Sequence, residues 1–131
     1  MYGNGVYVVT ETFHELYASL LKDVCTEHAR QQLEQGADGQ VLARGYAEQG
    51  KPDFTLAFLL LIEGSDEQKR ALLAQAYEER ARHSDEKAAQ LQLQFRRSFP
   101  MIKLSAQQDR AAAIAIRGGK RLPATGDEGR P

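Results

Sequence analysis

Apolar residues recur at steps of three and four between residues 12 and 35, which is the spacing of one face of an α-helix. Thr12, with Glu15 three residues later, has the pattern of a capping box, and Gly36 stands where helices commonly end. The spacing predicts a helix over residues 12–35 with a single apolar stripe. Its members are Phe13, Leu16, Tyr17, Leu20, Leu21, Val24, His28 and Ala29.

A second helix is expected between Asp38 and the stop signal Gly50–Lys51–Pro52. The nine residues 54–62 that follow carry no charged side chain. This run falls short of the roughly 20 apolar residues that a membrane span requires, so no membrane association is expected. It predicts a helix over 53–63, capped by Asp53 and enclosed by other helices.

The pattern from residue 66 to 98 is helical throughout, but it leaves open whether one helix or two are present, because Ser84 or Asp85 could cap a new one. Ser65 is expected to cap the start of this region, and Pro100 is expected to end it. Ser105 then caps a last predicted helix over 106–117, which Gly118 and Gly119 terminate.

Five to six helices joined by short linkers favour an all-α fold, either a small antiparallel bundle or a short array of αα-hairpins. Residues 1–11 contain glycines and β-prone residues and are expected to be an extended lead-in. Residues 12–117 form the single helical domain. Residues 118–131 are rich in glycine, proline and charge, which is typical of a flexible tail.

Residues 41–61 resemble residues 72–92 when the chain is shifted by 31 positions. The shared pattern includes Leu42, Ala43, Tyr46, Gly50 and Ala57, with Leu73, Ala74, Tyr77, Ala81 and Ala88 as counterparts. Over residues 41–95 the pattern resembles tetratricopeptide-type helical repeats, although the period is 31 rather than 34. The resemblance implies a protein-binding scaffold that holds a partner helix or peptide in a concave groove.

Charge is distributed unevenly along the chain, although its formal net value is only -1. Residues 1–95 hold 9 Lys and Arg against 15 Asp and Glu. The segment 96–121 opposes Asp109 to seven basic residues, which are Arg96, Arg97, Lys103, Arg110, Arg117, Lys120 and Arg121. This segment could contact nucleic-acid phosphates, or it could pair with the acidic body of the protein itself.

Candidate chemistry is sparse. Cys25 is the single cysteine, so an intramolecular disulfide or a paired-cysteine site is excluded, and a reducing cytoplasm is the expected location. His28, Glu79 and His83 are the candidates for a metal site in a helical bundle, but their number and spacing fall short of a complete ligand set. No cofactor motif is present, and no cofactor or catalytic residue is expected.

The sequence therefore favours a non-enzymatic protein-interaction module whose partner is another protein or a second copy of the chain. Nucleic-acid binding through residues 96–121, by Arg96, Arg97, Lys103, Lys120 and Arg121, is the alternative, and a metal-binding helical-bundle enzyme is the second. The expected interaction surface combines residues 38–64 with the C-terminal helix. Its candidate contact residues are Tyr46, Phe54, Phe58, Arg110, Ile114 and Arg117.

Overall fold

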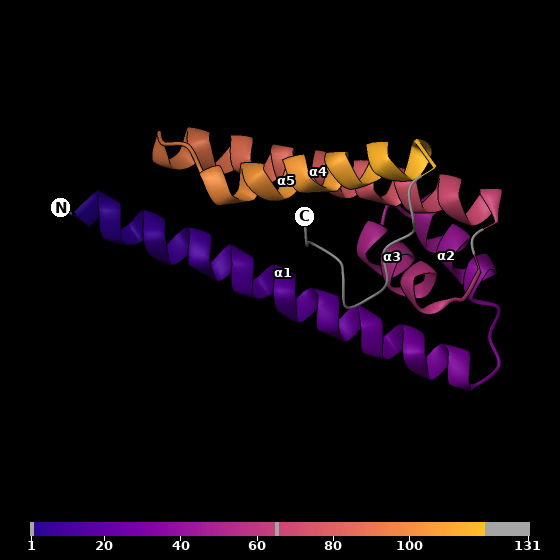
Figure 1. Cartoon of the computed structure of the whole chain (residues 1–131). Helices are drawn as coiled ribbons and strands as arrows, with labels where there is room; N and C mark the ends of the chain where they lie inside the picture. The colour runs from indigo at the N-terminus through magenta and orange to yellow at the C-terminus, as the bar shows by residue number, and fades with distance from the viewer. Residues whose placement is uncertain (1, 65, 120–131) are drawn as a thin grey trace.

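A computed structural model describes residues 2–64 and 66–119, with side chains from residue 11 onward. This part of the chain forms five helices and no strand: α1 (Tyr2–Glu34), α2 (Gly39–Glu48), α3 (Pro52–Leu61), α4 (Glu67–Phe95) and α5 (Pro100–Arg117). The predicted all-α bundle is therefore confirmed. Helices α4 and α5 pack side by side and antiparallel, α1 lies across from them, and α2 and α3 lie between them at one end (Figure 1).

Helix α1 begins at Tyr2 rather than Thr12, so the predicted extended lead-in is wrong from Tyr2 onward. β-propensity is effective only where a neighbouring strand pairs with the segment, and the described residues contain no strand. Extending an existing helix adds a backbone hydrogen bond for each residue fixed, so the helix continues instead. The predicted end is confirmed, because Gly36 has φ 88° just beyond the helix.

Helices α2 and α3 form a hairpin whose ends follow from local capping. Asp38 accepts hydrogen bonds from the backbone N–H groups of Gln40 and Val41 at 3.1 and 3.3 Å. Pro52 is the first residue of α3, so the predicted N-cap role of Asp53 is wrong. Proline suits this position because the first N–H groups of a helix have no intrahelical partner.

Residues 67–95 form one helix, which answers the question that the sequence left open. Asp66 caps α4 by accepting a hydrogen bond from the N–H of Lys69 at 2.8 Å. The predicted cap Ser65 lies outside the described residues. Helix α4 ends at Phe95, and its C-cap residue Arg96 has the left-handed conformation with φ 58°.

Helix α5 begins at Pro100, so the predicted start at residue 106 is wrong. The proline was expected only to end the preceding region, but it also fits the first position of a new helix. Ser105 is consequently an interior residue, and its hydroxyl donates to the carbonyl of Met101 at 3.1 Å. The predicted end at Gly118 and Gly119 is confirmed.

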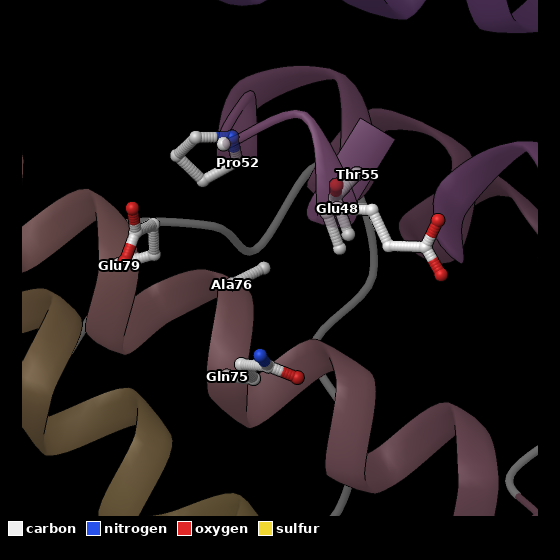
Figure 2. A pocket seen from close by; sticks show the side chains of 8 residues that line it. Glu48, Pro52, Thr55, Gln75, Ala76 and Glu79 are labelled. Atoms are coloured by element: carbon white, nitrogen blue, oxygen red, sulfur yellow. The ribbon is translucent and has the colours of Figure 1, made fainter. Parts of the chain in front are cut away.

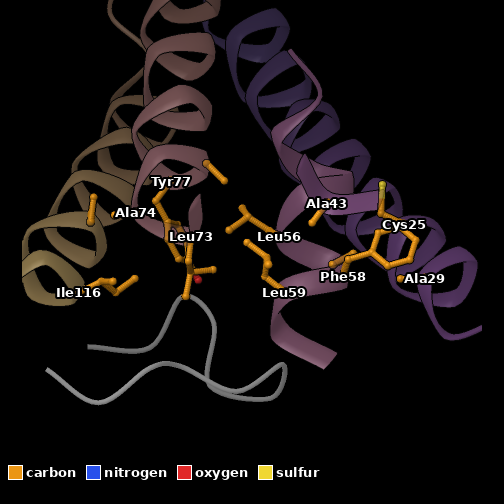
Figure 3. Close-up of a cluster of buried hydrophobic side chains, with 13 residues drawn as sticks. Cys25, Ala29, Ala43, Leu56, Phe58, Leu59, Leu73, Ala74, Tyr77 and Ile116 are labelled. Carbon is orange, nitrogen blue, oxygen red and sulfur yellow. The ribbon is translucent and has the colours of Figure 1, made fainter. Parts of the chain in front are cut away.

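The main core surrounds α3, whose apolar run is buried as predicted. Leu56, Phe58 and Leu59 are at most 1% exposed. Side chains from the other four helices surround them, namely Cys25, Ala29, Ala43, Leu73, Ala74, Tyr77 and Ile116 (Figure 3). Thr55, the polar member of the run, donates to the carbonyl of Ala43 at 3.2 Å, so its hydroxyl joins α3 to α2.

Lys69 closes the C-terminal end of α3 and is only 6% exposed. Its ammonium group donates to the carbonyls of Ile62 and Gly64 at 2.5 and 2.7 Å. Burial lowers the pKa of this amine, while nearby Asp66 acts in the opposite direction. Lys69 therefore provides a donor to two carbonyls of the segment that follows α3, whose last residue is Leu61.

The 31-residue echo does not produce two equivalent hairpins. Residues 39–61 form one αα-hairpin, but α4 runs unbroken through residues 82–85, where the second hairpin would need its turn. None of the described helices combines the length and the apolar character that a membrane span requires.

Candidate functional site

Five large apolar side chains form a continuous exposed face on α1, which we call the α1 apolar face. Phe13, Leu16, Tyr17, Leu20 and Val24 are between 54% and 63% exposed. They belong to the stripe that the sequence predicted as one apolar face. The remaining members of that stripe have a different environment: Ala29 is completely buried, Leu21 packs against the main core, and His28 is half-buried against Tyr46. Cys25, which the stripe did not include, is completely buried on the same side as Leu21 and Ala29.

The division of the stripe follows from helix geometry. Residues advance by about 100° around an α-helix, so Phe13, Tyr17, Leu20 and Val24 lie on a different side from Leu21, Cys25 and Ala29. Helix α3 packs only against the second side. The predicted stripe is wider than one packing partner can cover, and the α1 apolar face is the part left in contact with solvent.

A hollow of about 470 Å³ lies beside this face, between α1 and the pair α4 and α5. Tyr17 lines both the hollow and the α1 apolar face. His14, Lys87 and Ser105 contribute polar groups to its wall. Burial lowers the pKa of His14, and the positive charge of Lys87 lowers it further by a smaller amount. The positively charged form of this histidine is therefore disfavoured. His14 is half-buried in this wall.

Arg80 occupies one side of the hollow and connects three helices. It donates to both carboxylate oxygens of Asp109 on α5, at 2.9 and 2.8 Å. Its third nitrogen lies 3.7 Å from a carboxylate oxygen of Asp53 on α3. With two acids already facing its guanidinium, Arg80 has a structural role that limits its ability to bind an anion in the hollow.

Glu11 provides a polar contact between α1 and α5. Its carboxylate accepts a hydrogen bond from the backbone N–H of Met101 at 3.1 Å. This N–H is in the first turn of α5, and Phe99, the N-cap residue, provides no side-chain cap. A carboxylate at a helix N-terminus is favoured by the helix dipole, so Glu11 positions α1 while leaving its apolar face exposed.

The predicted contact residues on α2 and α3 form an internal aromatic cluster instead of an open surface. Tyr46 stacks on Phe54 and Phe58, with ring centroids 4.7 and 5.9 Å apart. His28 lies 3.1 Å from the Tyr46 hydroxyl, within hydrogen-bonding distance. Phe58 is completely buried, so it cannot contact a partner directly; Tyr46 and Phe54 are half-buried.

The predicted contact residues on α5 differ in their availability. Ile114 is 72% exposed. Arg117 donates to both carboxylate oxygens of Glu78, at 3.1 and 2.7 Å, and Arg110 donates to Asp85 at 2.5 Å. The hydrogen bonds from Arg117 lower the pKa of Glu78, so its carboxylate form is favoured in this pair.

The predicted composite surface is therefore divided, because α5 packs chiefly against α4 and, to a smaller extent, against α1, and its contribution to the core around α3 comes from buried side chains such as Ile116. The basic segment is divided as well. Arg110 and Arg117 pair with acids of α4, as one of the two sequence interpretations expected. Arg96, Arg97 and Lys103 are exposed near the α4–α5 turn. Lys120 and Arg121 lie outside the described residues.

The three metal candidates do not come together. His28 contacts the aromatic cluster, while His83 lies 3.1 Å from Glu79 on α4. Glu79 also accepts hydrogen bonds from Arg82, which lower its pKa. Within the described residues, no three His, Cys, Asp or Glu side chains are grouped so that they could hold a metal ion.

A smaller hollow of about 220 Å³ lies between the α2–α3 turn and α4 (Figure 2). Glu48, Pro52, Thr55, Gln75, Ala76 and Glu79 line it. The hydroxyl of Thr55 already donates to backbone carbonyls, and Glu79 pairs with Arg82. This hollow has two carboxylates but no nucleophile with an activating base, so it lacks the constellation that nucleophilic catalysis requires.

Cys25 does not provide a nucleophile either. Its side chain is completely buried. Burial, and to a smaller extent the negative charge of Asp53, raises the pKa of its thiol to about 11. The thiolate is the reactive form of cysteine, so Cys25 acts as a small core residue.

Compared with protein-family models, with curated proteins and with solved structures, the chain matches none. The fold and its surface therefore define a class only: a small all-α bundle in which one long helix carries an exposed apolar face. The sequence pattern grouped the residues of the α1 apolar face in one stripe with residues that the structure places in the core. The width of the stripe, eight residues over about 17 positions, was the available signal that two faces were involved.

Proposed function

We propose that this chain is a non-enzymatic protein-interaction module that binds a polypeptide through the α1 apolar face. The exposure of five large apolar side chains along one helix supports this proposal. Single exposed apolar residues are common on protein surfaces, but a contiguous patch of them is typical of an interaction site. A partner helix or an apolar groove would bury the face, as in other helix-mediated complexes.

The α1 apolar face is a better candidate than the surface predicted from sequence. Phe58 is inaccessible in the core, and Arg110 and Arg117 already pair with acidic side chains of α4. Two of the five basic side chains described in segment 96–121 are thereby neutralised, which weakens the case for phosphate binding. The proposal includes a cytoplasmic location, which suits a single cysteine with a free thiol.

A comparison of variants in a pull-down from the native host tests this proposal. Phe13→Ser combined with Leu20→Ser makes the α1 apolar face polar without disturbing a buried side chain. Leu93→Ser is the matched control, because Leu93 is 82% exposed on α4. We expect the same retained proteins with the wild type and the control, and at least a tenfold loss with the double variant. Equal retention by all three proteins would refute the proposal.

A further inference from the structure

The residues at the centre of the α1 apolar face have a palindromic spacing. Phe13, Tyr17, Leu20 and Val24 are separated by four, three and four positions, so the order of intervals is the same in both directions. A second α1 helix running antiparallel would place Phe13 opposite Val24 of the second copy, and Tyr17 opposite Leu20. A surface that is complementary to itself in this manner is what a two-fold symmetric dimer requires.

Charges along α1 favour the antiparallel arrangement. In this register Glu15 is level with Lys22 of the second copy, and Asp23 is level with His14. These groups flank the apolar face or lie behind it, so the register avoids repulsion rather than forming ion pairs. A parallel dimer in register would bring five acids of α1 level with their own copies, at Glu11, Glu15, Asp23, Glu27 and Glu34. It would also align the two helix dipoles unfavourably.

The area of the α1 apolar face is also large enough for a dimer interface. Aromatic side chains bury about 150–250 Å² each and aliphatic ones somewhat less, so five that are more than half exposed present on the order of 500 Å² per chain. Two such faces give about 1,000 Å², which is the lower end of the range for specific protein interfaces. The expected dimer is therefore one whose population depends on protein concentration.

From these observations we infer that the partner of the α1 apolar face is a second copy of this chain. The two α1 helices pack antiparallel through their apolar faces. The two-fold axis crosses the interface at the level of residues 18 and 19, midway between Tyr17 and Leu20. The inference rests on the proposed function, because it identifies the polypeptide that the α1 apolar face binds.

Light scattering across a concentration series of the full chain provides the first test. The wild type and Leu93→Ser should shift from the mass of one chain toward twice that mass as concentration rises. The Phe13→Ser, Leu20→Ser double variant should remain a monomer with an unchanged helical circular-dichroism spectrum. A wild type that stays monomeric at millimolar concentration, or a double variant that dimerises as the wild type does, would overturn the inference.

Disulfide trapping tests the orientation. Phe13→Cys and Val24→Cys are prepared separately, mixed and oxidised gently. Both variants keep Cys25, which is completely buried and is therefore not expected to form a disulfide. The antiparallel register predicts that the mixed Phe13→Cys, Val24→Cys disulfide forms at least fivefold faster than the disulfide of either variant with itself. Preferential formation of the Phe13→Cys self-disulfide would indicate parallel packing and would refute the proposed register.

The two proposals fail separately. A monomeric wild type overturns the self-association inference alone, provided that the double variant still loses the proteins retained in the pull-down. A dimer that the double variant does not weaken, together with unchanged retention, overturns both proposals.

Discussion

Arg80 and Asp109 join α4 to α5 through two parallel hydrogen bonds, at 2.9 and 2.8 Å. Their side chains are only 22% and 11% exposed, so removing one partner leaves a charged group largely shielded from water. Such a loss is more costly than the net contribution of the pair, because the remaining charge loses its nearest partner; for Arg80 only the carboxylate of Asp53, at 3.7 Å, is then left. Substitutions at the Arg80–Asp109 pair therefore test how much a largely buried ion pair contributes to the stability of the bundle.

Asp109→Asn should lower the free energy of unfolding by about 2–3 kcal/mol, since it removes the nearer of the two carboxylate charges that face Arg80 in a largely buried setting. Asp85→Asn is the matched control, because the Arg110–Asp85 pair is 45% exposed on both sides and should change stability by less than about 1 kcal/mol. Urea denaturation measures both. Equal losses for the two variants would contradict the assigned importance of burial.

Lys69→Met should also destabilise the protein, by about 1–3 kcal/mol, because the part-buried carbonyls of Ile62 and Gly64 lose their donor. Methionine keeps the length of the side chain, so the change isolates the ammonium group. Lys103→Met on the exposed side of α5 is the control and should have little effect. Hydrogen exchange should show the largest loss of protection at the end of α3; uniform loss across the chain would argue against a local capping role.

Two glycines of α2 should respond in opposite directions to alanine. A Cβ at Gly39 would approach the side chains of Ile62 and Leu33 to 2.6 and 2.8 Å. Gly39→Ala should therefore cost about 1–2 kcal/mol through overpacking.

A Cβ at Gly45 meets nothing within 4 Å. Gly45→Ala should stabilise the protein by about 0.5–1 kcal/mol, because alanine has the higher helix propensity. Thermal unfolding of both variants measures the contrast. A destabilised Gly45→Ala would show that α2 is less regular than described.

Cys25 should react slowly with iodoacetamide in the native protein and rapidly after unfolding, because it is completely buried and its thiol pKa is about 11. The raised pKa also predicts a pH effect. The unfolded thiol loses its proton first, near pH 9, so this contribution to stability is present below pH 9 and is lost as pH rises toward 11.

The matched measurement is the difference in unfolding free energy between the wild type and Cys25→Ala at pH 8 and at pH 10.5. The wild type should lose more stability than the variant over this interval. A constant difference would indicate that the thiol titrates normally in the folded protein.

Local sequence signals determined much of the helical architecture, and the reason is physical. Capping residues and glycines act on the backbone next to them, so Asp38, Gly36 and Gly118 were identified correctly. The apolar run 54–62 has no polar side to turn toward water, so its burial followed from composition alone.

Other features depended on what packs nearby. Pro100 is compatible both with the end of one helix and with the start of the next, and only the structure shows that α5 begins there. The same is true of α1. Its sequence established that apolar residues recur at helical spacing, but the placement of α3 against Leu21, Cys25 and Ala29 decided which side became core. Phe13, Tyr17 and Leu20 remain exposed because one packed helix covers only one side of another.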